Sequence, residues 1–175
     1  MKWEAEFLRS LSGLRCGFMD AFMKFFSFIC DYGWFLISVV LILLINKKTR
    51  RIGIEAAVTL IFTALITNVI IKGLVHRVRP YEAYDFIEVL TRKPFDSSFP
   101  SGHTSNSFAV AVAVFIHNKK IGIPLIILSA GIAFSRLYNG VHYPTDVLAG
   151  IVIGVTVPIV VHIIMKRIME KKEVK

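Results

Sequence analysis

Residues 121–165 read IGIPLIILSAGIAFSRLYNGVHYPTDVLAGIVIGVTVPIVVHIIM and contain two apolar runs separated by a short polar turn. The runs extend from Ile121 to Leu137 and from Thr145 to Met165, and each approaches the roughly 20 residues that a helix needs to cross a bilayer. Asn139 and Gly140 suit a tight turn, and Pro144 suits the first turn of the helix that follows. The stretch therefore predicts two membrane-spanning helices joined by a polar turn.

The composition of the whole chain also indicates a membrane protein. Of its 175 residues, 55% are hydrophobic, and the mean hydropathy of +0.64 is too high for an ordinary soluble domain. Three further apolar runs extend from Tyr32 to Ile45, from Gly53 to Val75 and from His103 to His117. The first and third are short, so tilt, local thinning of the bilayer or an extension of the first helix back toward Phe18 must supply the missing length. We expect an all-α polytopic helix bundle of five to six spans, forming a single domain over residues 1–175.

Residues 1–30 are predicted to form an interfacial or partly inserted helical segment. The aromatic stretch FMDAFMKFFSFIC contains Asp20 and Lys24 and is followed by Asp31. Early acidic residues, with no small-residue cleavage site before a short apolar core, argue against a removable signal peptide.

Lys and Arg residues are distributed unequally between the two ends of the predicted spans. The segments NKKTRR and HNKK and the basic tail at 166–175 hold eleven of the 21 Lys and Arg residues but only two acidic residues, and Glu55 brings the acids of this face to three of 12. Because positively charged loops tend to stay in the cytoplasm, this face and its tail are predicted to be cytoplasmic. The loops 76–102 and 138–144 then face outward from the cell membrane. The basic charge reflects this topology, and no clustered basic stripe indicates a nucleic-acid partner.

Several charged residues near the outer ends of the spans are not explained by topology. Lys72, His76 and Arg79 have the spacing of one helical face, and Pro80 is predicted to end that helix. Lys72 lies a turn or more inside the span, where an ammonium group is costly unless it faces a polar cavity or a partner. An alternative is that the Lys72 side chain extends to the membrane interface and places its ammonium group in water. This segment by itself favours neither interpretation.

The segment FPSGHTSNS closes the longer outer loop. Ser101 and Gly102 can turn the chain so that backbone N–H groups at the start of the next helix point toward an anion, and His103 lies beside them. The same residues would also serve as an ordinary turn and helix cap.

Arg136, His142 and Asp146 fall within eleven residues of one another around the second polar turn. His142 precedes the last helix and Asp146 lies in its first turn, so the carboxylate can hold one imidazole nitrogen and leave the other free to react. Taken singly, Asp146 also suits a helix start and Arg136 an interfacial anchor.

Together these residues indicate phosphoryl transfer. The cations Lys72, Arg79 and Arg136 can neutralise a phosphoryl group and stabilise its transition state. One histidine can attack phosphorus and form a phosphohistidine while the other protonates the leaving oxygen, and the residues alone leave this division open. Because the cations already fill the electrostatic role and carboxylates are few, we expect no metal and no other cofactor.

The segments KGLVHRVRP, PSGH and SRLYNGVHYPTD resemble the three signatures of the type 2 phosphatidic acid phosphatase family. The family pattern is Lys, six residues and Arg-Pro; then Pro-Ser-Gly-His; then Ser-Arg, five residues, His, three residues and Asp, and this chain matches it without a departure. The resemblance covers about residues 15–165. It implies a metal-independent membrane lipid phosphatase in which His142 is the nucleophile, Asp146 its orienting partner and His103 the general acid. The phosphate-binding residues that it implies are Lys72, Arg79, Ser101, Gly102 and Arg136.

The resemblance implies a phosphorylated membrane lipid as substrate. An outward-facing site suits undecaprenyl pyrophosphate, because this carrier is released on the outer leaflet after cell-wall polymerisation. Phosphatidylglycerophosphate and phosphatidic acid are the alternative substrates. A protein that binds or transports an anionic lipid without hydrolysing it is the alternative from another class. His103, His142 and Asp146 disfavour it, because binding alone needs only cations and hydrogen-bond donors.

Three sets of residues are predicted to lie outside this site or at its edge. His117 and His162 fall on the cytoplasmic side and are predicted to be interfacial or packed histidines. Gly150 and Gly154 form a small-xxx-small pair, which favours close helix packing within the bundle. His76 shares the predicted helical face of Lys72 and Arg79, so a position at the pocket entrance is one interpretation of this residue.

Overall fold

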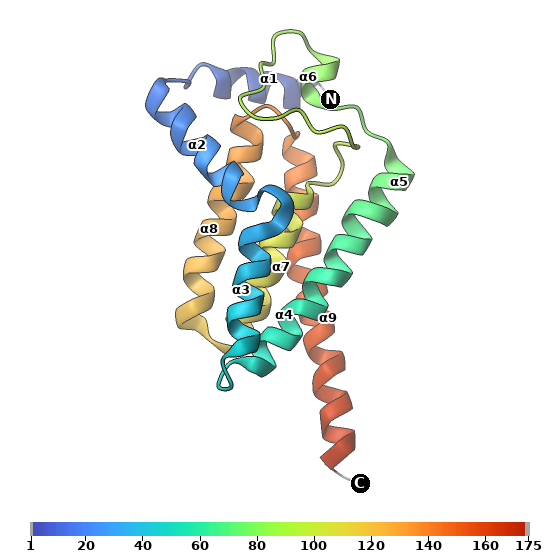
Figure 1. Cartoon of the computed structure of the whole chain (residues 1–175). Coiled ribbons are helices and arrows are strands. Elements are labelled where there is room, and N and C mark those ends of the chain that lie inside the picture. The colour runs from blue at the N-terminus through green and yellow to red at the C-terminus, as the bar shows by residue number, and fades with distance from the viewer. Residues whose placement is uncertain (1, 174–175) are drawn as a thin grey trace.

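The computed structural model describes residues 2–173 and consists of helices and loops over that range (Figure 1). Its elements in chain order are α1 (Lys2–Ser12), α2 (Gly17–Cys30), η1 (Asp31–Gly33), α3 (Trp34–Ile45), α4 (Arg50–Ala64), η2 (Leu65–Ile71), α5 (Lys72–Val75), α6 (Pro80–Ala83), α7 (Gly102–His117), α8 (Lys119–Tyr138) and α9 (Pro144–Glu173).

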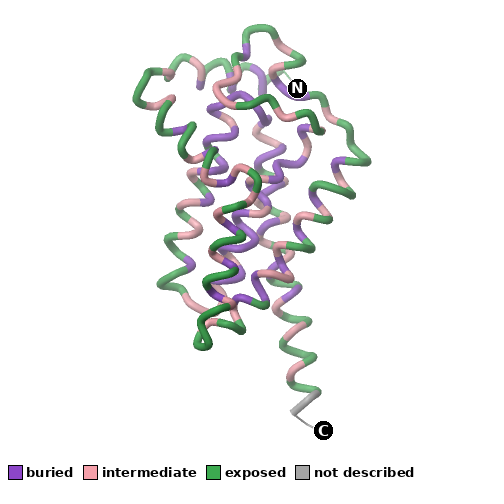
Figure 2. Tube along the Cα trace, viewed as in Figure 1, coloured by how far each residue is buried: buried purple, intermediate pink, exposed green. Residues whose placement is uncertain are grey.

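Helix α7 forms the centre of the bundle. It packs against α4, α8 and α9, and most of its side chains are buried (Figure 2). Four other helical segments are long and apolar enough to cross a membrane, namely Gly17–Ile45, Arg50–Ala83, Lys119–Tyr138 and Pro144–Lys171. Together these elements confirm the predicted all-α transmembrane bundle. The five predicted apolar runs all lie in helices, and α7, with 16 residues, is the short span that the sequence indicated.

The first span is not one continuous helix, so its expected extension toward Phe18 is kinked. Tyr32 and Gly33 adopt left-handed backbone conformations, with φ of 54° and 72°, and separate α2 from α3. Glycine tolerates this conformation without a steric penalty, which makes Gly33 a natural breakpoint. Helix α2 then packs along α8, while α3 packs against α4. Insertion of residues 1–30 into the bilayer stays a prediction.

The prediction that Lys72, His76 and Arg79 share one helical face is wrong. The helix ends at Val75, and the next residue, His76, is exposed and has a left-handed φ of 45°. Arg79 is extended, as expected for a residue before proline, and Pro80 begins α6 rather than ending a helix. His76 therefore turns to the surface, whereas Lys72 and Arg79 are both buried.

The packing of α7 against α9 depends on two glycines of α9. A Cβ atom on Gly150 would lie 2.9 Å from the Ser101 carbonyl oxygen, and one on Gly154 would lie 2.6 Å from that of Ser105. These distances leave no room for a side chain. The predicted close approach within the bundle is confirmed, and it brings the N-termini of α7 and α9 together at one end of the molecule.

Candidate active site

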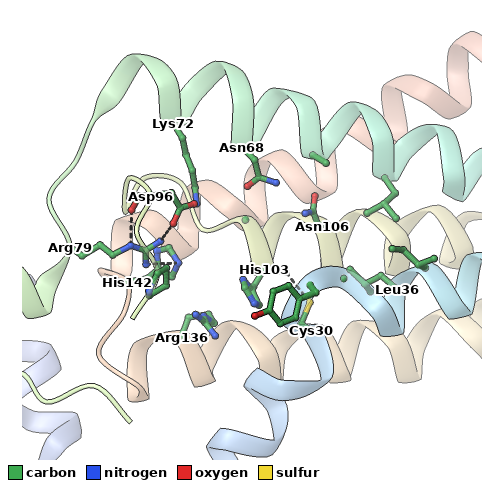
Figure 3. Close-up of a pocket in the computed structure, with 17 residues that line it drawn as sticks. Cys30, Leu36, Asn68, Lys72, Arg79, Asp96, His103, Asn106, Arg136 and His142 are labelled. Atoms are coloured by element: carbon green, nitrogen blue, oxygen red, sulfur yellow. Dashed lines mark hydrogen bonds and ion pairs between the residues drawn. The ribbon is translucent and has the colours of Figure 1, made fainter. Parts of the chain in front are cut away.

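A pocket with a volume of about 360 Å³ lies at the end of the bundle where α7 and α9 begin (Figure 3). Five of the predicted site residues contribute to its polar wall, although they come from separate parts of the chain: Lys72, Arg79, His103, Arg136 and His142. Apolar side chains of α3 and α4 also line the pocket, namely Leu36, Ile37, Leu60 and Ala64. The pocket thus combines clustered cations and two imidazoles with a surface suited to a hydrocarbon chain.

Lys72 and Arg79 are bridged by Asp96, which lies in the loop before α7. The ammonium of Lys72 contacts Asp96 Oδ2, and Arg79 Nη2 donates to Oδ1 at 2.6 Å. Arg79 Nε also donates to the Asp96 carbonyl oxygen at 2.8 Å, and Nη1 donates to the Val141 carbonyl at 2.7 Å. The guanidinium is therefore held between the loop before α7 and the turn before α9.

Asp96 is ionised throughout the neutral range. Burial alone would raise the pKa of this carboxyl group, but the hydrogen bond and charge of Lys72, followed by those of Arg79, outweigh burial and lower the pKa to about 2. Its side chain is nevertheless 52% exposed. The carboxylate lies where both buried cations converge.

Arg136 supplies a third buried cation. Its exposed fraction is only 2%, and one guanidinium nitrogen contacts the Ser27 hydroxyl of α2. Its Nε has no hydrogen-bond partner among the residues that the structure describes. Because a buried donor without a partner is costly, this guanidinium is well prepared to bind an anion in the pocket.

His142 lies between Arg79 and Asp146. Its Nε2 is 3.5 Å from Arg79 Nη1, and its Nδ1 is 3.5 Å from Asp146 Oδ2. The latter distance exceeds that of a normal hydrogen bond, as is often seen in catalytic groups before substrate binds. Burial lowers the pKa of His142 to about 3, and the charges of Arg79 and Arg136 act in the same direction, against the contact with Asp146. The imidazole is consequently neutral near pH 7, the state that a nucleophile requires.

Asp146 is fixed by more partners than the sequence indicated. Its Oδ2 accepts hydrogen bonds from the Ser98 hydroxyl at 2.5 Å and from the Tyr143 backbone N–H at 2.9 Å. Its Oδ1 accepts a hydrogen bond from Arg77 Nη1 at 2.5 Å. This carboxylate is fully buried, and these donors hold it behind His142.

Arg77 connects the site to α1. Its Nη2 forms a 2.6 Å ion pair with Glu4, whose other carboxylate oxygen accepts from the Thr145 hydroxyl at 2.6 Å. The guanidinium also lies over the Tyr143 ring, 4.1 Å from its centroid. The N-terminal helix is therefore tied to the turn that carries His142 and Asp146.

His103 has a carboxylate partner of its own. Its Nε2 is 3.2 Å from Asp31 Oδ1, where Asp31 begins the break between α2 and α3. This contact brings the N-terminal segment into the wall of the pocket.

Ser101 and Gly102 occupy different positions relative to the pocket. Gly102 lines it, and a Cβ atom there would lie 2.4 Å from Asn68 Oδ1. Ser101 is buried outside the lining, with its hydroxyl 2.9 Å from Thr104 Oγ1 and its N–H donating to the Asp146 carbonyl at 3.0 Å. A direct phosphate contact by Ser101 stays a prediction.

Three charged residues of the site were missed by sequence reasoning: Asp31, Arg77 and Asp96. Arg77 stands two residues before the matched Arg79, so only the tertiary structure distinguishes the roles of the two arginines. Asp31 and Asp96 carry no spacing signal, because their partners lie 72 and 24 residues away. Asp31 is paired with His103, and Asp96 is paired with Lys72 and Arg79.

Comparison with known proteins adds an independent observation. The PAP2 superfamily profile matches residues 53–170. The undecaprenyl-diphosphatase BcrC of Bacillus subtilis is 31% identical over 154 residues, which cover 87% of this chain and 79% of that protein. An undecaprenyl-diphosphatase of Sulfolobus acidocaldarius is 35% identical over 71% of this chain and 59% of its own length.

The fold has a counterpart in a crystal structure. A transmembrane PAP2-type phosphatidylglycerolphosphate phosphatase from Bacillus subtilis superposes with a TM-score of 0.80 and 23% sequence identity, covering 95% of this chain and 86% of the other. The helical arrangement, the three sequence signatures and the profile match agree with one another. The chain belongs to the PAP2 superfamily and is a membrane phosphatase acting on phosphate esters.

Proposed function

We propose that the protein hydrolyses a phosphoryl group from a prenyl diphosphate lipid of the undecaprenyl pyrophosphate class through a phosphohistidine. The observation that carries the proposal is one pocket that is lined by three cations, two histidines and apolar side chains of α3 and α4. The cations suit the phosphoryl groups and the apolar side chains suit the beginning of the lipid chain.

In the first step, Nε2 of neutral His142 attacks phosphorus as the bond to the leaving oxygen breaks. Lys72, Arg79 and Arg136 stabilise the charge on the non-bridging oxygens. His103 gives its proton to the leaving oxygen, and the lipid departs with one phosphoryl group fewer. The Asp146 carboxylate stabilises the positive charge that develops on the attacking imidazole.

In the second step, water replaces the lipid in line with the P–N bond. His103, now neutral, removes a proton from this water as its oxygen attacks phosphorus. The P–N bond breaks, the electron pair returns to His142 Nε2, and inorganic phosphate leaves. Both histidines then have the protonation states in which they began. Protein cations supply the electrostatic stabilisation, so we propose that turnover requires no metal.

The charge distribution of the loops indicates on which side of the membrane the pocket opens. The end of the bundle opposite the pocket carries NKKTRR, HNKK and the basic tail, which favours a cytoplasmic position. The pocket would then open on the extracytoplasmic side of the cell membrane, where prenyl diphosphate is released. The similarity to two undecaprenyl-diphosphatases supports this substrate over phosphatidylglycerophosphate and phosphatidic acid.

The test is release of inorganic phosphate by the purified protein in detergent with excess EDTA. Undecaprenyl pyrophosphate, phosphatidylglycerophosphate and phosphatidic acid are compared at equal mole fraction in the micelle. We expect the diphosphate to give the highest kcat/KM and His142→Ala to abolish turnover. His76→Asn is the matched control, because His76 is exposed and Asn tolerates its left-handed backbone.

Other outcomes separate the alternatives. Faster hydrolysis of a monophosphate lipid than of the diphosphate would contradict the proposed substrate but not the phosphatase chemistry. Binding of all three lipids without turnover would contradict hydrolysis and favour a lipid-binding or transport protein.

A further inference from the structure

A second cluster of polar side chains lies at the opposite end of the bundle from the pocket. Glu55 of α4 is 2% exposed, and its Oε2 is 2.9 Å from Nε2 of His117, the last residue of α7. Its Oε1 is 3.0 Å from Nδ1 of His162 in α9. His117 lies 14 residues beyond His103 on α7, which corresponds to about 21 Å along the helix axis. The cluster therefore takes no part in the chemistry of the pocket.

The prediction that His117 and His162 are merely interfacial or packed is incomplete, because both converge on one buried carboxylate. In the sequence, Glu55 was considered only when the charges of the cytoplasmic face were counted. A carboxylate inside an apolar bundle is costly unless it is hydrogen-bonded, paired or bound to a metal. Three separate helices bring together one carboxylate and two imidazoles, a set of donors that many metal sites share.

We propose that Glu55, His117 and His162 bind one divalent transition-metal ion of the Zn²⁺ class. One donor atom from each residue lies within 4.8 Å of the other two. Zn–N and Zn–O bonds of about 2.0–2.2 Å place tetrahedral donor atoms about 3.3 Å apart, so a modest convergence of the side chains forms the site. His162 has the most freedom to move, because its side chain is 28% exposed.

The protonation chemistry of the three residues is compatible with this binding. In the metal-free form, each imidazole can donate the N–H that faces Glu55. In the metal-bound form, the proton resides on the other ring nitrogen and the inward nitrogen coordinates the ion. Neutral imidazoles therefore need not release a net proton. His117 and His162 are partly exposed, which leaves room for a fourth ligand.

The consequence of binding is a cross-link between α4, α7 and α9. Helix α7 carries His103 at its other end, α9 begins two residues before Asp146, and α4 continues through η2 to Lys72. An ion that binds only the folded protein raises its stability by mass action. Imidazole and carboxylate ligands favour Zn²⁺, Co²⁺ and Ni²⁺ over Mg²⁺.

The test uses the full chain purified in detergent without a polyhistidine tag, treated with EDTA and then freed of chelator. Titration with Zn²⁺ is followed by calorimetry and by thermal unfolding, and the metal content is measured after removal of free ion. We expect one ion per chain outside the phosphate-binding pocket, a Tm raised by several degrees and no comparable effect of Mg²⁺. His162→Ala and Glu55→Gln should each weaken binding by about tenfold or more.

The double variant His103→Ala/His142→Ala serves as the control for metal binding in the phosphate-binding pocket and should keep the stoichiometry of one. Co²⁺ added to this variant should give the visible absorption of a low-symmetry nitrogen and oxygen site, a readout independent of whether Glu55→Gln folds. Absence of stoichiometric Zn²⁺ binding by the wild-type chain would overturn the proposal. So would binding that folded His162→Ala retains in full, or that the double variant loses.

Discussion

Arg77 illustrates how a residue at an unspecified position of the first signature can shape the site. It lies beside the signature arginine in sequence, yet it contacts Asp146, Glu4 and Thr145 and does not line the pocket. Its planar guanidinium can serve these partners simultaneously, which a single ammonium group cannot do with the same geometry. Arg77 is therefore a positioning residue for the carboxylate behind His142.

We predict that Arg77→Ala lowers kcat by about tenfold or more, a smaller effect than the roughly 10⁴-fold loss typical of removing the orienting acid itself. KM should change little, because Arg77 does not contact the pocket. Steady-state phosphate release provides the measurement, and Arg77→Lys should recover only part of the rate. Arg9→Ala is the matched control, since Arg9 lies over the Phe86 ring away from the pocket. An unchanged kcat in Arg77→Ala would contradict the role.

The contact between Asp31 and His103 leads to a prediction about pH. A protonated His103 loses a favourable charge partner in Asp31→Asn, so the imidazole gives up its proton at lower pH. The alkaline limb of the kcat profile should move to lower pH by about one unit. Asp85→Asn, in an exposed loop, should leave the profile unchanged. A lower kcat with no movement of the limb would indicate that Asp31 only shapes the fold.

Asp96 is paired with Lys72 and Arg79, two of the cations that we propose bind the substrate phosphate. We predict that Asp96→Asn lowers the inhibition constant of inorganic phosphate about threefold to tenfold, because one competing negative charge is removed. The pKa of Asp96 is about 2, so the carboxylate stays ionised from pH 5 to pH 8 and the variant should be inhibited more strongly at every pH in this range. Inhibition measured at several pH values tests both statements. Weaker inhibition in the variant would show that Asp96 chiefly orients Lys72 and Arg79.

At the scale of helices, α7 determines how the catalytic parts meet. It begins at the pocket with Gly102 and His103, ends at the far cluster with His117, and packs against three other helices. Its approach to α9 is close because α9 presents Gly150 and Gly154 to it. The relative position of His103 and His142 therefore depends on contacts made by residues that carry no chemistry.

We predict that Gly154→Ala destabilises the protein by about 1–3 kcal/mol, because its Cβ would overlap the Ser105 carbonyl and Phe108. Thermal unfolding in detergent should show a lower Tm. Gly73→Ala is the matched control, since a Cβ there has nothing within 4 Å and alanine favours a helix. Equal Tm values for the two variants would contradict tight α7 to α9 packing.

At the scale of the whole molecule, the two ends of the bundle differ in chemistry. One end carries α1 and the loop before α7, and the other carries the basic loop between α3 and α4 and the end of the long C-terminal helix (Figure 1). The two cysteine thiols lie in different environments. Cys16 is exposed, whereas Cys30 is buried and lines the pocket.

The proposed orientation predicts which end a membrane-impermeant maleimide reaches. In Cys30→Ser, Cys16 should be labelled in intact spheroplasts. In a variant that lacks both native thiols and carries Lys171→Cys, labelling should require permeabilisation, because that position lies in the basic tail. The reverse pattern would place the phosphate-binding pocket on the cytoplasmic side.

The sequence alone was sufficient to predict an all-α membrane bundle, its helical runs and the proximity of His142 to Asp146. The length of an apolar run, its hydropathy and the spacing of a motif are properties of neighbouring residues in the chain. They can therefore be recognised in the sequence before the tertiary structure is known. The tertiary structure decided the kink at Tyr32 and Gly33 and the surface position of His76. It also placed Asp31 against His103, Arg77 against Asp146, and Asp96 between Lys72 and Arg79. Glu55, His117 and His162 meet at the far end. These contacts join residues distant in sequence and depend on how helices pack, which no local spacing encodes.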